Sequence, residues 1–211
     1  MKMYLIRHGR QCSKLCNVDV DLCPQGYRQA ALVGERLAKE RIQIVYSSAL
    51  KRAVETARTA NLYWNVEHEV EPELREICFG LMEGMSDEEI EKRFGDWKRE
   101  QKKMERDIPY PEGECAGDVI RRVMPVLEKI GRQPNERAAV VTHGGVIRSV
   151  VSYILGMEPG KYRLLGKNLE NCSITELSFD KETGRFTLER FNDYAHLENE
   201  PELLRSSWHE S

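Results

Sequence analysis

Two histidines, each following an apolar run and preceding a glycine, are the residues of this 211-residue sequence best suited to chemistry. The first ends the segment 3–9, where Arg7 precedes His8 and Gly9. The second lies in 138–145, where His143 precedes Gly144. Short apolar runs of this kind predict buried strands, and open α/β sheets bind ligands at the carboxyl ends of their strands. The pattern therefore predicts a phosphoryl-transfer site built on histidine.

A histidine that attacks phosphorus must be neutral and must present one ring nitrogen to the substrate. A backbone carbonyl can hold the proton of the other nitrogen, which fixes the tautomer. Positive charge on the neighbouring Arg7 disfavours the imidazolium form of His8 and also neutralises charge on the phosphoryl oxygens. We expect Gly9 to remove a side chain where the phosphate comes close. A lone Arg-His-Gly tripeptide would equally suit an ordinary histidine at a strand end.

Three further features favour the chemical interpretation. Arg52 lies at the start of a predicted helix, from which it can point over the carboxyl edge of the sheet. Gly144 begins a segment that leads into another helix, whose N-terminal amides can bind an anion. Glu76 lies in an irregular loop, where its carboxyl group can act as the general acid for a leaving alkoxide.

The elements that must position these residues alternate between strands and helices. This order predicts a largely parallel sheet with helices on both faces, ended by an antiparallel hairpin. Residues 79–113 interrupt the order and predict a helical cap inserted over the site. The polar tail, 197–211, is expected to be frayed. The predicted strands are 3–7, 43–46, 66–70, 138–141, 173–179 and 185–191, and the predicted helices are 24–40, 49–60, 86–106 with a break near Gly95, 116–132 and 146–155.

Composition excludes several classes of protein. A net charge of −3 argues against general nucleic-acid binding, which requires a basic surplus. The absence of a long apolar run and of a signal-peptide pattern predicts a cytoplasmic protein without a membrane partner. The six cysteines show no dense disulfide pattern, and Cys12, Cys16 and Cys23 lack Cys-x-x-Cys spacing. We therefore favour free thiols over metal ligands for these three residues, whose role stays open.

Taken together, the motifs resemble the histidine phosphatase superfamily, also called the phosphoglycerate mutase-like family. Its signature is similar to residues 5–9, and its second histidine motif is similar to residues 141–148. Each segment alone is a weak to moderate signal, but the segments occur in the family's order over most of the chain. The remaining similar segments are 24–30, 46–57, 74–84 and 192–197.

The resemblance implies a role for each matching residue. His8 would be the nucleophile that becomes phosphohistidine, and Glu76 would protonate the leaving oxygen. Arg7, Arg52 and His143 would bind the phosphoryl group, and no metal or cofactor would be needed. It also implies one domain over residues 1–211 with the fold of a three-layer α/β/α sandwich, which agrees with the largely parallel sheet predicted above.

The substrate rim departs from the family pattern. Arg10 and Gln11 follow the signature where an acidic or amide residue and then a hydroxyl residue are usual. Gln11 can still donate a hydrogen bond to phosphate, and Asn17 is the candidate for a displaced family asparagine. Gly144 is a further candidate for substrate binding. Arg10 fits a contact with a second anionic group of the substrate and a solvated surface position equally well.

The cap carries more basic than acidic residues between 91 and 106. Such a surplus could steer a phosphorylated substrate, but it is more typical of a solvated helix face, which we favour. Trp97 is similarly expected to pack the cap against the domain, in preference to lining the pocket, and the same holds for Tyr110.

The leading hypothesis is a phosphatase that hydrolyses a small phosphorylated metabolite through a phosphohistidine. The alternative is a cofactor-dependent phosphoglycerate mutase, which would return the phosphoryl group to the substrate; such mutases typically carry a longer insertion than this chain has. A catalytically silent binding module on the same fold is a third possibility. The physiological substrate, and the choice between a monomer and a homodimer, are not determined by the sequence.

Overall fold

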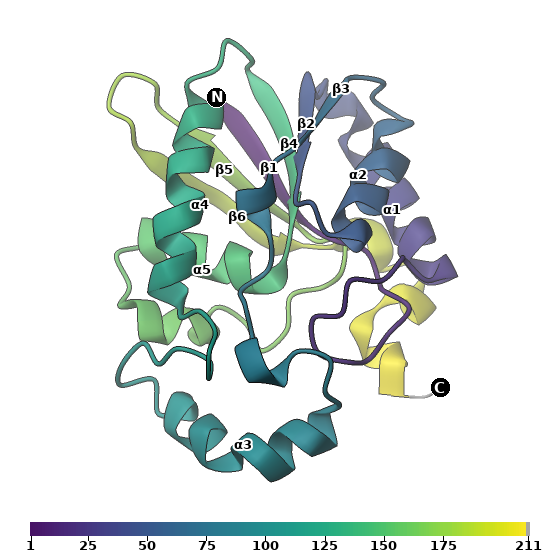
Figure 1. The fold of residues 1–211 in the computed structure, drawn as a ribbon. Helices are drawn as coiled ribbons and strands as arrows, with labels where there is room; N and C mark the ends of the chain where they lie inside the picture. The colour runs from purple at the N-terminus through teal and green to yellow at the C-terminus, as the bar shows by residue number, and fades with distance from the viewer. Residues whose placement is uncertain (210–211) are drawn as a thin grey trace.

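The computed structural model describes residues 1–209, and within them six strands form one mixed sheet (Figure 1). The strand order is β3-β2-β4-β1-β5-β6. Neighbours from β3 to β1 are parallel, whereas β5 runs antiparallel to both β1 and β6. The strands are β1 (Lys2–Arg7), β2 (Ile44–Ser47), β3 (Glu67–Val70), β4 (Arg137–Thr142), β5 (Ile174–Phe179) and β6 (Phe186–Asp193).

Helices cover both faces of this sheet because side chains alternate along its central strands. From β1, Tyr4 and Ile6 pack in the same cluster as residues of α1 and α2. Met3 and Leu5 point the other way, into the cluster that α4 and α5 complete. The predicted three-layer fold with a largely parallel sheet and an antiparallel strand is therefore confirmed. The helices are α1 (Pro24–Leu37), α2 (Lys51–Asn61), α3 (Asp87–Lys102), α4 (Ala116–Gly131) and α5 (Gly144–Ile154).

Helix α3 stands apart from the sandwich, below the carboxyl ends of the parallel strands (Figure 1). A capping box starts it: the Ser86 hydroxyl accepts from the Glu89 amide at 3.2 Å, and the Glu89 carboxylate accepts from the Ser86 amide at 2.9 Å. The helix is interrupted at Phe94, whose φ of −127° is not helical, one residue before the expected position. The Trp97 indole donates to the Pro109 carbonyl at 2.9 Å and ties the helix to the segment that follows it.

The C-terminal segment is ordered against α1, so its predicted fraying is wrong for residues 197–209. Leu197 and Leu203 are buried, and the Gln29 amide of α1 donates to the Leu203 carbonyl at 2.7 Å. Short 3₁₀ turns at Ala195–Leu197 and Pro201–Leu203 pack against α1, and a third turn, Arg205–His209, follows; Figure 1 draws this segment in yellow. Residues 210 and 211 lie outside the described part of the chain.

Among residues 1–209, no helix has the length and apolar character needed to cross a bilayer.

Candidate active site

His8 lies immediately after β1 and is 5% exposed. Its Nδ1 lies 2.8 Å from the Gly9 carbonyl oxygen, so a neutral ring with its proton on Nδ1 donates there and leaves the Nε2 lone pair for attack. Burial lowers the pKa of His8 well below its ordinary value, and the charges of Arg52 and Arg7 lower it further. The ring is therefore neutral near pH 7, as a nucleophile must be.

Two arginines near His8, the buried Arg52 and the half-buried Arg7, each have a donor without a partner within the described residues. Arg52 is anchored by bonds from its terminal nitrogens to the Val18 carbonyl, at 2.9 Å, and to the Asn17 side-chain oxygen, at 2.6 Å. Arg7 is anchored on the Leu169 carbonyl. In both arginines, Nε is buried and has no hydrogen-bond partner within the described residues. Buried donors normally have partners, so these orphans indicate a place for an anion.

His143 lies immediately after β4, at the start of α5, and is fully buried beside His8, with the two ring centroids 5.1 Å apart. Its Nε2 lies 2.9 Å from the Ser48 hydroxyl, while its Nδ1 is buried without a partner in the part of the chain that is described. Burial and then Arg52 lower the pKa of His143 well below its ordinary value, so this ring is also neutral. If Ser48 donates to Nε2, the proton lies on Nδ1 and is a third unpartnered donor.

Glu76 lies in the irregular segment between β3 and α3 and lines the same pocket as His8. One of its carboxylate oxygens accepts from its neighbour's amide, that of Ile77, at 2.9 Å. The other accepts from the Gly145 amide at 3.3 Å, in the first turn of α5. The helix N-terminus predicted to bind an anion thus uses one of its amides to orient the candidate acid.

A half-buried ion pair holds the loop that carries Glu76. The guanidinium of Arg122, on α4, donates to both oxygens of Glu114 and to the Glu76 carbonyl at 3.2 Å. Glu114 in turn accepts from the Cys78 amide at 2.9 Å. Burial raises the pKa of Glu114, but the bonds from Arg122 and Cys78 outweigh burial and leave that pKa below its usual value.

We expect Arg122→Ala to lower the free energy of unfolding by about 3 kcal/mol, because it removes both hydrogen bonds of the guanidinium to the half-buried Glu114 carboxylate and leaves only Arg75, 3.7 Å away, as a cationic partner among the described residues. Arg121→Ala is the matched control: its side chain is 78% exposed, so we expect a change within about 0.5 kcal/mol. Urea denaturation followed by circular dichroism measures both. Equal stabilities for the two variants would contradict the role given to the Arg122–Glu114 pair.

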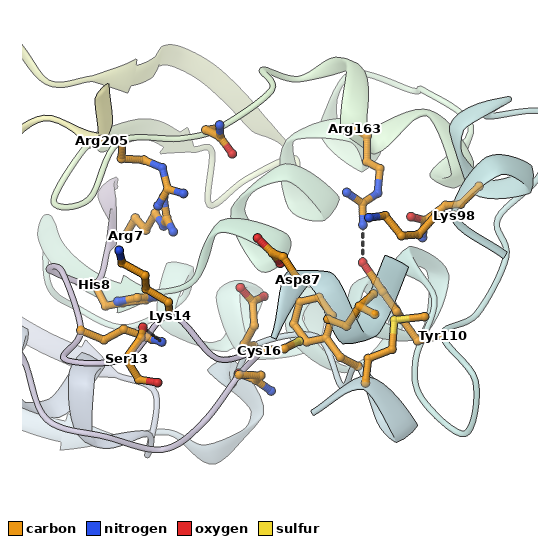
Figure 2. Close-up of a pocket in the computed structure, with 18 of the residues that line it drawn as sticks. Arg7, His8, Ser13, Lys14, Cys16, Asp87, Lys98, Tyr110, Arg163 and Arg205 are labelled. Carbon is orange, nitrogen blue, oxygen red and sulfur yellow. Dashed lines mark hydrogen bonds between the residues drawn. The ribbon is translucent and has the colours of Figure 1, made fainter. Parts of the chain in front are cut away.

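One cavity of about 740 Å³ collects most of the predicted residues. Figure 2 shows Arg7, Lys14 and Arg205 grouped around His8 on one side, with Arg163 and Lys98 on the other. Trp97 and Tyr110 line the cavity as well, so the preference for a packing role alone was wrong for both. The predicted site residues that line it are Arg7, His8, Gln11, Asn17, Arg52 and Glu76, whereas the fully buried His143 lies beside His8 without lining the cavity.

Gly9 serves a different purpose from the one expected. A Cβ at Gly9 would lie 2.6 Å from the Gly26 carbonyl oxygen, and a Cβ at Gly26 would lie 2.2 Å from the Arg10 carbonyl oxygen. The two glycines therefore let the segment after β1 cross the first turn of α1. The Gly9 amide donates to the Thr56 hydroxyl at 2.9 Å. Close packing of two backbones is therefore sufficient to require glycine at this position.

The substrate-rim residues lie in different places. Gln11 lines the cavity and donates to the Ser13 carbonyl at 3.0 Å. The Asn17 amide donates to Glu83 at 2.9 Å while its oxygen holds Arg52, so this side chain positions an arginine. Arg10 lines a smaller adjoining cavity of about 200 Å³ and not the main one. Gly144 lies beside Arg7, where an added Cβ would be 3.5 Å from Nε.

Several residues of the site had no signal in the sequence. Arg205 reaches the cavity from the C-terminal segment, and its guanidinium donates to the Asn171 side-chain oxygen at 3.3 Å. Asn171 donates to the His8 carbonyl at 2.7 Å. Burial, with Arg205 nearby, lowers the pKa of Arg7 to about 9. Arg205 was missed because the tail was expected to be frayed. Asn171 lies outside every motif, and Ser48 lies in the family-like segment 46–57 but was given no role there.

The six cysteines, Cys12, Cys16 and Cys23 among them, are free thiols. Within residues 1–209, no cluster of three or more histidine, cysteine or acidic side chains could hold a metal ion.

Several known proteins resemble this chain in sequence or in fold. The putative phosphoserine phosphatase 2 of Hydrogenobacter thermophilus is 29% identical over 204 residues, which cover 92% of this chain and 97% of the relative. A probable phosphoglycerate mutase of Yersinia enterocolitica is 26% identical over 207 residues, covering 94% and 95%. Among solved structures, the phosphoserine phosphatase of Entamoeba histolytica with 3-phosphoglyceric acid gives a TM-score of 0.78 at 28% identity, covering 93% and 98%.

A mycobacterial glucosyl-3-phosphoglycerate phosphatase in complex with inorganic phosphate gives a TM-score of 0.82 at 25% identity, with 92% of this chain and 98% of that chain covered. The model of the histidine phosphatase superfamily (branch 1) matches residues 3–194, almost the whole chain. The resemblance drawn from the motifs is confirmed: this protein belongs to the histidine phosphatase superfamily.

Proposed function

We propose that this protein is a phosphatase that hydrolyses small phosphomonoesters through a phosphohistidine at His8. The observation that carries the proposal is the buried, neutral His8 ring, tied through Nδ1 to the Gly9 carbonyl and faced by Arg7 and Arg52. Relatives named as phosphatases, acting on phosphoserine and on glucosyl-3-phosphoglycerate, support hydrolysis as the reaction.

The reaction follows in two steps. Nε2 of His8 attacks phosphorus as the bond to the ester oxygen breaks, and Glu76 gives that oxygen its proton. The ionised Glu76 then takes a proton from water, whose oxygen attacks the phosphohistidine. Inorganic phosphate leaves and His8 is regenerated with its ring neutral.

Negative charge on the transferring phosphoryl group is stabilised by the three unpartnered nitrogen donors described above. Nε of Arg7, Nε of Arg52 and Nδ1 of His143 are held in place before substrate arrives, because other atoms of the same side chains are already bonded. Preorganised donors in a water-poor site stabilise developing charge with little reorganisation. Arg7 and Arg52 also keep His8 unprotonated, so the same two cations activate the nucleophile and stabilise the transferring group.

A phosphatase and a phosphoglycerate mutase share the first step, in which His8 takes the phosphoryl group. A relative named as a probable phosphoglycerate mutase keeps the mutase as an alternative. Incubation with 3-phosphoglycerate and 2,3-bisphosphoglycerate separates them. We expect release of inorganic phosphate; isomerisation without release would replace the phosphatase by a mutase. No release from a broad panel of phosphomonoesters between acidic and neutral pH would favour a silent binding module.

Further features of the proposal rest on the sequence. We place the chain in the cytoplasm, as one domain over 1–211 with 79–113 as its cap, acting as a monomer or homodimer. The partner is a small phosphorylated metabolite, and the chemistry assigned above uses no metal or cofactor.

The protonation state of His8 gives a pH prediction. An ordinary histidine, with a pKa near 6.5, is mostly protonated at about pH 6. Because the pKa values of His8 and His143 are lowered, we expect both rings to remain neutral there, with the proton of His8 on Nδ1. Nitrogen-15 NMR of the histidine rings reads charge and tautomer, and the His8→Ala spectrum assigns the signals. A His8 ring that titrates near pH 6.5 would contradict the proposed nucleophile.

A further inference from the structure

The far end of the cavity carries positive charge that the reaction at His8 does not use. Arg163 and Lys98 lie at this end (Figure 2), and Lys102, one helical turn after Lys98, also lines the cavity; we call the three the distal basic cluster. Arg163 belongs to the 3₁₀ segment Pro159–Leu164 after α5, and the two lysines belong to α3. Figure 2 shows Arg163 and Lys98 across the pocket from Arg7, His8 and Arg205. The cavity therefore has a basic group at each end.

Arg163 is the most informative member of the cluster. Its guanidinium lies 6.0 Å from the ring centroid of Tyr110 and 5.3 Å from that of Tyr162, and it donates to the Tyr110 hydroxyl. Its Nε is buried without a hydrogen-bond partner, and no ion pair within residues 1–209 includes Arg163. A guanidinium stays charged in proteins, and a buried charge is costly unless an anion compensates it. Lys98, in contrast, already has Glu91 as a partner.

Aromatic rings line the space around this cluster. Tyr110 packs against Phe79 and Trp97, with ring centroids 4.7 and 4.6 Å apart, and all three residues line the cavity. Asp87, which Figure 2 draws between the two basic ends, is an acidic group facing the same space. A carboxylate there disfavours negative charge midway along the cavity. The middle suits a neutral body, and the two ends suit anions.

The size of the cavity agrees with this division. Its volume of about 740 Å³ lies in the upper half of the range of roughly 300–1,000 Å³ that is usual for pockets that enclose whole ligands. A phosphoryl group at His8 fills only a small part of it.

We propose that the distal basic cluster binds a second anionic group of the substrate, a carboxylate or a phosphate, at the far end of a neutral body from the phosphoryl group that is removed. The inference rests on the proposed phosphatase function and names its substrate class: phosphomonoesters with a remote second anion. Arg163 is the determinant of that preference, because its half-buried guanidinium lines the cavity and has no acidic partner among the described side chains.

Non-hydrolysable phosphonates test the proposal. The probes are ω-phosphonocarboxylates with one to six methylenes, each compared with its methyl ester, as inhibitors of p-nitrophenyl phosphate hydrolysis. We expect the acid to inhibit better than the ester by at least about tenfold once the chain spans the cavity, and with little difference for the shortest chain. α,ω-Bisphosphonates, compared with alkylphosphonates of equal length, show whether the distal cluster prefers phosphate to carboxylate. Tighter inhibition by either ligand with a second anionic group supports the proposal.

The advantage of acid over ester should fall to near one in Arg163→Gln and persist in Arg163→Lys. Arg99→Gln is the matched control, because its side chain is 66% exposed, pairs with Asp96 and does not line the cavity. The ratio is internal to each variant, so a change in overall activity does not affect it. A ratio near one at every chain length in the wild-type protein overturns the inference, as does an unchanged ratio in Arg163→Gln. Absence of p-nitrophenyl phosphate hydrolysis would instead overturn the proposed function.

Discussion

Replacing His8 with alanine is expected to lower kcat for phosphomonoester hydrolysis by at least about 10⁴-fold, the scale of loss when a covalent nucleophile is removed. The ring is buried beside His143, and no other described histidine lines the cavity, so no second histidine can replace it as the nucleophile. Phosphate release measured with p-nitrophenyl phosphate reads the loss. Binding of inorganic phosphate should persist, because Arg7 and Arg52 remain.

His68→Asn is the matched histidine control. His68 lies on β3, where its Nε2 contacts the Ser47 hydroxyl at 2.8 Å, and it does not line the cavity. We expect this variant to keep wild-type turnover. Activity near the wild-type level in His8→Ala would remove His8 as the nucleophile, whatever the control shows.

Glu76→Gln is expected to slow alkyl phosphates by about 10²- to 10⁴-fold, the range that general acid catalysis contributes. An alkoxide needs a proton as it leaves, whereas p-nitrophenolate leaves well without one. Hydrolysis of p-nitrophenyl phosphate should therefore fall much less in its first step. Gln keeps the oxygen that accepts from the Ile77 or Gly145 amide, so the loop should stay in place. The measurement is kcat/KM for a series of esters with graded leaving groups.

Glu73→Gln supplies the comparison within the same loop, because Glu73 pairs with Arg75 at the surface and does not line the cavity. It should leave the dependence on the leaving group unchanged. Equal losses for alkyl and p-nitrophenyl esters in Glu76→Gln would count against Glu76 as the acid.

The order of strands and helices could be predicted because each follows a local periodicity. The central residues of β1 and β4, 3–6 and 138–141, are apolar, as those of buried strands are, and a histidine follows each strand. Adjacent parallel strands bring their carboxyl ends to one edge, and β1 pairs with β4 with Arg7 opposite Thr142. The meeting of His8 and His143 therefore follows from the sequence pattern together with the strand order.

What could not be predicted depends on contacts between segments far apart in the sequence. The docking of the tail requires Gln29 of α1 to meet Leu203, and nothing in the polar stretch after residue 197 signals that partner. Arg122 looks like any polar position of an amphipathic helix until Glu114 and the loop that carries Glu76 meet it. From the sequence, Gly9 suggested only room for phosphate. Its close approach to the Gly26 backbone, which also requires a glycine, is visible only in three dimensions.

The central claim is that a phosphoryl group is carried by His8, and direct detection of that bond tests it. The protein is mixed with p-nitrophenyl phosphate, quenched within the first turnovers under alkaline conditions, digested and mapped by mass spectrometry. We predict one added phosphoryl group on the peptide that contains His8, stable in base and lost in acid, and absent in His8→Ala. Phosphate on another residue, or turnover with no covalent phosphate at any quench time, would contradict the account.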